Sequence, residues 1–259
     1  MPAEDSRWFD KHCARAGRPL RLFCIPHAGA AGYPYRAWMP HLPESIEVIG
    51  VRLPGRGARI AEVAFRRMDP LVTALTEAII AELGRPFALF GHSMGALIAF
   101  ELCARLGQLG FEPRHLFVSG TRAPHLPRDE KSLHTLPRER FIQELRALNG
   151  TATELLEDES VVASLLPPLR ADFELVETYP ARERARLTCP ITAFGGRDDP
   201  TVSEDELAAW SRYTTQDFRR VLFPGDHFFI GSEQSAVLRT ISQTLSASSS
   251  GRGSVAAGT

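Results

Sequence analysis

Apolar and polar residues along the chain form two alternating patterns. Short and nearly continuous apolar runs, typical of strands buried on both faces of a sheet, cover residues 20–25, 46–51, 87–90, 115–118, 191–194 and 218–223. Between and after these runs, apolar residues recur at helical spacing over residues 33–42, 69–83, 96–106, 203–213 and 235–245. Strands that alternate with helices predict an α/β fold with a mostly parallel sheet covered by helices on both faces.

The helix predicted at residues 69–83 carries sequence signals at both ends. Asp69 is expected to be its N-cap and Pro70 its first helical residue. Gly84 is expected to end it. Its apolar residues share one helical face, so we expect this face to pack on the sheet.

The strand–helix alternation stops between residues 121 and 186. Apolar residues in this stretch are spaced as in several short helices, and the sequence contains no clear strand there. A helical insertion between two sheet strands predicts a lid over the active-site face. A helical subdomain with a purely structural role is the alternative.

Both ends of the chain lack a regular pattern. Residues 1–18 predict an irregular leading segment in which Trp8 and Phe9 pack on the domain. Residues 246–259 consist almost entirely of serine, glycine, alanine and other small residues, and we expect this tail to be disordered. The sequence therefore predicts one domain over residues 1–245, with the insertion at about 121–186.

Composition and charge indicate which binding partners and which cellular compartment to expect. The 259 residues are 44% hydrophobic and carry a formal net charge of −1, which gives no indication of a nucleic-acid or anionic-membrane partner. Neither a signal-peptide core nor an apolar run of membrane-spanning length is visible. The four cysteines are widely spaced without a C-x-x-C pair, so we expect reduced thiols in a cytoplasmic protein.

The pentapeptide Gly91-His92-Ser93-Met94-Gly95 lies between a predicted strand and a predicted helix. Strand, G-x-S-x-G and helix form the context of a nucleophile elbow, which exposes the serine hydroxyl above the sheet. By itself the motif is weak evidence for a catalytic serine, because an ordinary glycine-rich turn between a strand and a helix has the same sequence. With partners for Ser93 elsewhere in the chain, we interpret it as the nucleophile.

A serine nucleophile needs a base, and the base needs an acid to fix its tautomer. His227, directly after the last predicted strand, is the expected base, and Asp198 or Asp199, after the preceding strand, is the expected acid. The order Ser, Asp, His is the order found in α/β-hydrolases. Asp226 is a weaker alternative acid that fits a turn-stabilising role better.

Two further histidines lie near the expected site. His92 cannot serve its neighbour Ser93 as base, so we interpret it as a packing residue. His27 lies in the small-residue loop 26–32, where it shapes the loop or, as an alternative, transfers protons directly. No pair of histidines or cysteines has metal-ligand spacing, and the predicted chemistry requires no metal or cofactor.

The oxyanion of a tetrahedral intermediate needs two hydrogen-bond donors. The backbone N–H of Met94, at the start of a helix, is one candidate. The second should come from the loop after the first strand, where Ala28 is best placed. A tight turn without a catalytic role is the alternative for this loop.

Five motifs, in order, resemble those of the type II thioesterases, the free-standing editing enzymes of polyketide and nonribosomal peptide synthases. They are His27-Ala28-Gly29-Ala30, Arg52-Leu53-Pro54-Gly55-Arg56-Gly57, Gly91-His92-Ser93-Met94-Gly95, Gly195-Gly196-Arg197-Asp198-Asp199-Pro200 and Gly225-Asp226-His227-Phe228-Phe229. The resemblance spans about residues 18–245 and implies an α/β-hydrolase fold. It places Ser93 on the nucleophile, His227 on the base and Asp199 on the acid. Ala28 and Met94 fall on the oxyanion donors.

The resemblance implies hydrolysis of short, aberrant or stalled acyl groups from the phosphopantetheine arm of an acyl or peptidyl carrier protein, without a cofactor. Three alternatives remain open at this point. They are an esterase acting on small esters, an acyltransferase in which an alcohol or amine replaces water, and a hydrolase-fold binding protein without activity. Acyl-chain preference and oligomeric state do not follow from the sequence.

Overall fold

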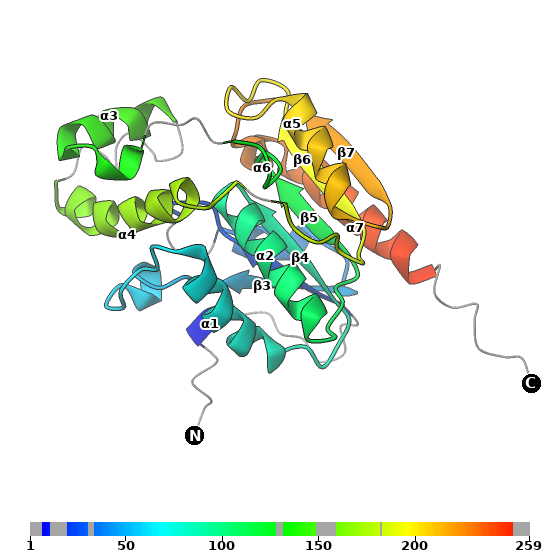
Figure 1. The fold of residues 1–259 in the computed structure, drawn as a ribbon. Helices are drawn as coiled ribbons and strands as arrows, with labels where there is room; N and C mark the ends of the chain where they lie inside the picture. Colours follow the sequence, from blue (N-terminus) through cyan, green and yellow to red (C-terminus); the bar gives the residue numbers. More distant parts are fainter. Residues whose placement is uncertain are drawn as a thin grey trace, which may run out of the picture.

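The computed structural model describes residues 7–10, 20–30, 34–127, 132–148, 159–181 and 183–250. Within these ranges the chain forms a seven-stranded sheet in the order β1-β3-β2-β4-β5-β6-β7 (Figure 1). The strands are β1 (Phe9–Asp10), β2 (Leu20–Ile25), β3 (Ile46–Val51), β4 (Phe87–His92), β5 (Leu116–Ser119), β6 (Ile191–Gly196) and β7 (Phe218–Phe223). β1 is antiparallel to β3, and the other neighbouring strands are parallel, which confirms the predicted sheet.

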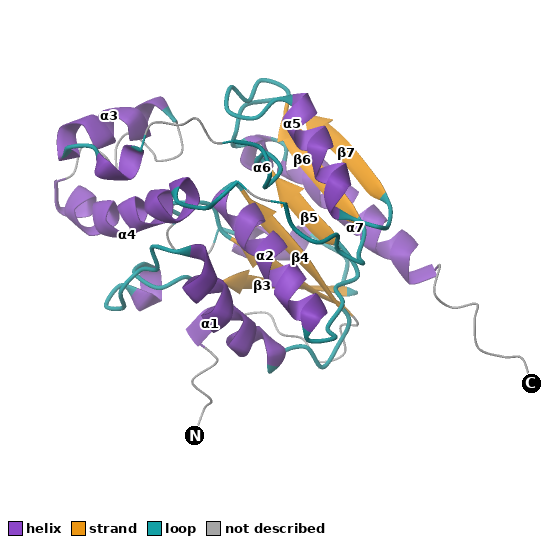
Figure 2. Ribbon diagram, viewed as in Figure 1, coloured by secondary structure: helices purple, strands orange, loops and turns teal. Residues whose placement is uncertain are grey.

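Helices cover both faces of this sheet (Figure 2). One face packs against α1 (Met68–Ile80), α2 (Met94–Gln108), α5 (Glu204–Ala208) and the 3-10 helix η6 (Ala209–Tyr213). The other face packs against the 3-10 helix η2 (Arg36–His41), α6 (Phe229–Ser232) and α7 (Gln234–Ser250). A further 3-10 turn, η3, spans Gly57–Arg59. No helix in the described part of the chain is long and apolar enough to cross a membrane.

The strands alternate their side chains between two hydrophobic clusters. In β4, Phe87 and Leu89 belong to the cluster under α1 and α2, whereas Ala88 and Phe90 belong to the cluster under α7. Because both faces are covered, both sets of side chains are apolar. This double burial explains why the strands appear in the sequence as continuous apolar runs rather than as alternating ones.

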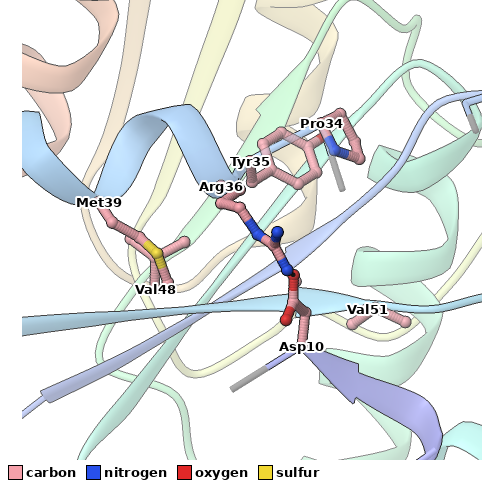
Figure 3. A pocket seen from close by; sticks show the side chains of 8 residues that line it. Asp10, Pro34, Tyr35, Arg36, Met39, Val48 and Val51 are labelled. Atoms are coloured by element: carbon pink, nitrogen blue, oxygen red, sulfur yellow. Dashed lines mark hydrogen bonds and ion pairs between the residues drawn. The ribbon is translucent and has the colours of Figure 1, made fainter. Parts of the chain in front are cut away.

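The edge strand β1 differs from the predicted irregular leading segment. Trp8 and Phe9 are buried as predicted, but Phe9–Asp10 also pairs with β3. The buried carboxylate of Asp10 accepts hydrogen bonds from Arg36 at 3.4 Å and from Arg52 at 3.1 Å, and Figure 3 shows the Arg36 guanidinium against it. A two-residue strand held by ion pairs is too short to be recognised as a sequence pattern. Residues 1–6 and 11–19 lie outside the described ranges.

Two predicted helix ends are wrong. α1 begins at Met68 with Arg67 as its N-cap residue, and Asp69 lies inside the first turn. Its carboxylate binds Arg105 of α2 at 2.5 Å instead of capping the helix. Pro70 is tolerated there because the first turn has no use for its missing N–H. The helix stops at Ile80, before Gly84.

At the other end of the chain, α7 continues to Ser250. The predicted start of a disordered tail at residue 246 is therefore wrong for residues 246–250. The preceding apolar positions explain the extension, since Val237, Leu238, Ile241 and Leu245 anchor the helix in the sheet core. The rest of the predicted tail, residues 251–259, lies outside the described residues.

The insertion contains the 3-10 turn η4 (Leu133–Thr135), α3 (Arg138–Ala147) and α4 (Glu159–Glu177). α3 and α4 lie together at one side of the molecule, apart from the layers around the sheet (Figure 1). They share a small hydrophobic cluster of their own: Phe141, Leu145, Val162, Leu166 and Leu169. Ala28 packs against both this cluster and the main core. Residues 128–131, 149–158 and 182 of the insertion lie outside the described ranges.

Candidate active site

Ser93 occupies the turn between β4 and α2 with φ 53° and ψ −117°. It is the single non-glycine residue with positive φ in the part of the chain that the structure describes. The glycines on either side permit the turn. A Cβ on Gly91 would lie 2.0 Å from the carbonyl oxygen of Gly95, and one on Gly95 would lie 2.2 Å from that of Ile25. The G-x-S-x-G sequence thus has the strained geometry of a nucleophile elbow.

His227 lies in the loop after β7, and its ring contacts the carboxylate of Asp199 from the loop after β6. The distance from His227 Nδ1 to Asp199 Oδ2 is 2.7 Å. The Asp199 side chain is 1% exposed and that of His227 is 18% exposed. The Asp199 carboxylate is therefore shielded from water, while the His227 imidazole still reaches the surface.

The charge of Asp199 is maintained by its hydrogen bonds. Burial raises the pKa of this carboxyl, but the bonds from His227 and Thr201 together outweigh burial and lower the pKa below its usual value. Asp199 is therefore ionised at neutral pH. An anionic acceptor at Nδ1 keeps the proton of a neutral His227 on that nitrogen and leaves Nε2 free to accept another.

Thr201 stabilises the contact between Asp199 and His227, and this role was not predicted from the sequence. Its backbone N–H and its hydroxyl both donate to Asp199 Oδ1, at 2.8 and 2.7 Å. The hydroxyl oxygen also lies 3.2 Å from His227 Nδ1. An aspartate whose side chain accepts from the backbone N–H two residues later forms an Asx turn, and Asp199-Pro200-Thr201 is compatible with such a turn.

The two other aspartates near His227, Asp198 and Asp226, form hydrogen bonds to the backbone of the surrounding loops. Asp198 Oδ2 accepts a hydrogen bond from the Gly225 N–H at 3.2 Å, and the Asp198 N–H donates to the Gly225 carbonyl at 3.0 Å. Asp198 therefore joins the two loops that carry Asp199 and His227. Asp226 Oδ1 accepts from the Phe228 N–H at 2.8 Å, which confirms its predicted turn-stabilising contact.

Three imidazoles cluster at this edge of the sheet. The His92 ring centroid lies 5.1 Å from that of His227 and 6.0 Å from that of His27. Burial lowers the pKa of His27 and of His92 below the usual value. Both are therefore neutral at pH 7, and neither repels a positive charge that forms on His227. His92 Nδ1 lies 2.9 Å from Ser119 Oγ, in keeping with a packing role.

The two expected oxyanion donors lie on adjoining segments. Met94 is the first residue of α2, where the backbone N–H has no partner within the helix. Gly95, the next residue, is in close contact with the carbonyls of Ile25 and Pro26. The start of α2 therefore lies against the loop that carries Ala28. Residues 31–33 of that loop lie outside the described ranges.

With this geometry in place, comparisons with known proteins identify the family. The thioesterase-domain family model matches residues 20–245. This chain belongs to the type II thioesterases. It is 36% identical to the type II thioesterase BorB from the borrelidin biosynthetic cluster, with a TM-score of 0.86 over 94% of this chain and 99% of BorB.

This type II thioesterase has two relatives with gramicidin in their names. It is 43% identical over 226 residues to the gramicidin S biosynthesis protein GrsT of Aneurinibacillus migulanus, which covers 87% of this chain and 88% of GrsT. It is also 43% identical over 244 residues to LgrE of Brevibacillus parabrevis, covering 93% of each chain. LgrE is named as a linear gramicidin dehydrogenase. That name does not carry over, because the family model and BorB are both thioesterases.

Proposed function

We propose that this type II thioesterase hydrolyses acyl thioesters from the phosphopantetheine arm of carrier proteins, with Ser93, His227 and Asp199 as its catalytic triad. Family membership supports the reaction class, and relatives in gramicidin S and borrelidin biosynthesis support an assembly-line carrier protein as the partner. The observation that carries the proposal is the contact of 2.7 Å between His227 and Asp199. Ser93 separately has the backbone geometry of a nucleophile elbow.

In the first half of the reaction, Ser93 Oγ attacks the thioester carbonyl carbon. His227 takes the hydroxyl proton on Nε2, and Asp199 stabilises the imidazolium through Nδ1. The carbonyl oxygen becomes negatively charged and accepts hydrogen bonds from the Met94 and Ala28 N–H groups. The C–S bond then breaks, and the pantetheine thiolate leaves as the thiol after taking the proton from His227.

In the second half, water replaces the thiol. His227 removes a proton from the water, which attacks the acyl–Ser93 ester through a second tetrahedral intermediate. Collapse of that intermediate releases the carboxylic acid, and His227 returns its proton to Ser93 Oγ. Apart from the water, the protein's own side chains and backbone supply the groups used in these steps, and we propose that the reaction takes place in the cytoplasm.

The proposal is tested by turnover of a short acyl-pantetheine thioester and its matched oxoester. We expect the purified protein to hydrolyse the thioester with the higher kcat/KM and to be labelled by a fluorophosphonate. Ser93→Ala should abolish both the turnover and the label. Preference for the oxoester would indicate an esterase, and product formation that requires an added alcohol or amine would indicate an acyltransferase. Failure of the wild-type protein to react in either assay would leave a binding protein.

A further inference from the structure

A buried ion pair joins the helical insertion to the main domain. Arg56, in the loop after β3, donates from Nη1 to Asp172 Oδ2 at 2.6 Å and from Nη2 to Asp172 Oδ1 at 2.7 Å. Asp172 lies on α4 of the insertion. Both residues are buried, with 9% of Arg56 and 2% of Asp172 exposed. A bidentate pair of this kind fixes distance and orientation together.

The same carboxylate also holds the loop that carries Ala28. Asp172 Oδ2 accepts a hydrogen bond from the Gly29 N–H at 2.9 Å. The Ala28 carbonyl oxygen, on the other side of that peptide unit, lies 2.9 Å from His27 Nδ1. The peptide unit between Ala28 and Gly29 is therefore held at both its oxygen and its nitrogen.

Sterics reinforce this contact. Gly29 has φ +73°, and a Cβ on it would lie 2.3 Å from Cδ1 of Leu169, which is also on α4. Ala28 packs against the hydrophobic cluster of the insertion as well as the main core. Helix α4 thus meets the loop at two successive residues, through one polar and one apolar side chain.

We propose that Asp172 and Arg56 are positioning residues for the oxyanion site. Asp172 fixes the peptide unit after Ala28, which restrains the backbone that carries the Ala28 N–H. Arg56 holds the Asp172 carboxylate and neutralises its charge. The inference rests on the proposed function, because it gives the Ala28 N–H its catalytic meaning.

The two members of the pair have unequal electrostatic effects. A negative charge that develops near Ala28 is opposed by an uncompensated carboxylate and favoured by an uncompensated guanidinium. Arg56→Gln leaves the carboxylate alone in a buried position. Asp172→Asn keeps an acceptor for Gly29 and leaves the positive charge. Loss of Arg56 should therefore harm turnover more than loss of the Asp172 charge.

The experiment measures kcat and KM on a free acyl-pantetheine thioester, Ki for an alkylboronic acid that forms a tetrahedral adduct on Ser93, and melting temperature. For Arg56→Gln we expect kcat to fall about 10²-fold, the magnitude seen when an oxyanion donor is lost. Ki should rise by a similar factor, while KM changes little. Asp172→Asn should lose about tenfold in kcat, because its single amide oxygen cannot hold Gly29 and both Arg56 nitrogens as the carboxylate does. The double variant should recover part of the Arg56→Gln loss.

Glu174→Gln is the matched control. Glu174 lies on the same helix, and its carboxylate pairs with Arg66 and Arg67 rather than with Arg56. We expect its kcat and Ki to match the wild type. If Arg56→Gln fails to fold, Asp172→Asn and the double variant still decide the matter.

Two results would overturn the positioning role. One is wild-type kcat and Ki in Asp172→Asn and in the double variant. The other is a loss of kcat that follows melting temperature alone, with boronate Ki unchanged in the folded fraction. Failure of the proposed function gives a different result, because the wild-type protein itself would then neither turn over the thioester nor bind the boronate.

Discussion

At the scale of single residues, Ser93 combines its proposed role as nucleophile with a backbone cost. Its φ of 53° lies in a region that costs a residue with a Cβ about 1–3 kcal/mol. Glycine adopts this region freely, although it loses about 0.5–1 kcal/mol through its flexibility in the unfolded chain. The elbow thus holds its serine at the expense of stability.

We therefore expect Ser93→Gly to be more stable than Ser93→Ala by about 1 kcal/mol, while both are inactive. Urea unfolding of the two variants measures the difference, and both should remain unlabelled by a fluorophosphonate. Alanine is the proper reference because it keeps the Cβ and removes only the hydroxyl. Equal stability of the two variants would show that the surrounding structure does not strain this residue.

The adjacent aspartates offer a second test at this scale. Asn in place of Asp199 still accepts from Thr201, but it presents an amide to His227 Nδ1 and so favours the wrong tautomer. In serine hydrolases with this triad, such a change costs about 10⁴-fold in kcat. We expect a loss of this order for Asp199→Asn. Asp198→Asn, which contacts Gly225 and not His227, should lose little. Steady-state kinetics decides, and the reverse order would assign the acid to Asp198.

The limits of sequence reasoning are clear from these residues. The order of Ser93, Asp199 and His227 along the chain was sufficient to predict which loops meet, since parallel strands end at one edge of the sheet. The choice between Asp198 and Asp199 depended on the family resemblance, because the two lie in the same loop. The contact between Arg56 and Asp172 joins residues 116 positions apart, and no local pattern indicates such a pair.

At the scale of elements, strands buried on both faces were the best predicted because burial imposes apolar side chains throughout. The predicted ranges 20–25 and 46–51 match the buried strands β2 and β3. The range 203–213 matches α5 and η6, which follow a capping box at Ser203. The errors lie where tertiary contacts decide. Asp69 is drawn to Arg105, and α7 is extended by its anchorage in the core.

A buried histidine between β5 and β6 gives the sheet a dependence on pH. His115, directly before β5, bonds Thr192 of β6 through Nε2 at 2.8 Å. Burial lowers the pKa of His115 from 6.5 to about 4. The unfolded chain takes up this proton below about pH 6.5, whereas the folded chain does so only near pH 4. The contribution to stability is therefore full above pH 6.5 and is lost as pH falls toward 4.

We expect the free energy of unfolding to fall by up to about 2 kcal/mol between pH 7 and pH 5 through this one group. His115→Gln keeps a donor for Thr192 and removes the titration, so the fall should be smaller by that amount. Urea unfolding at the two pH values measures both proteins. A variant with the same pH dependence as the wild type would exclude His115 as the source.

At the scale of the whole molecule, charge is unevenly distributed. The net charge is −1, but helix α3 of the insertion is rich in arginine. Arg138, Arg140 and Arg146 on α3 are exposed. Arg138 shares its charge with Glu159 at 2.5 Å, whereas Arg140 contacts the neutral Gln143 at 3.3 Å. α3 lies at the side of the molecule, apart from the sheet layers (Figure 1). A carrier protein with acidic surface helices could dock there while its pantetheine arm reaches Ser93.

If this helix receives the carrier protein, Arg140→Glu should raise KM for an acyl-carrier substrate about tenfold and leave kcat unchanged. The effect should be larger at low salt, where the Debye length is about 30 Å at 0.01 M. Turnover of the free acyl-pantetheine thioester should not change, because that substrate has no protein surface to dock. Arg138→Glu should have a smaller effect on KM, since Glu159 already offsets part of its charge.

Arg219→Glu is the matched control, because Arg219 is exposed on the edge strand β7, outside the insertion. It makes the same charge change and should leave KM for the acyl-carrier substrate unaltered. A rise in KM that is equal for Arg140→Glu and Arg219→Glu would mean that overall charge, rather than α3, attracts the carrier protein. An equal loss on carrier-bound and free substrates would mean that α3 shapes the acyl site instead of the docking surface.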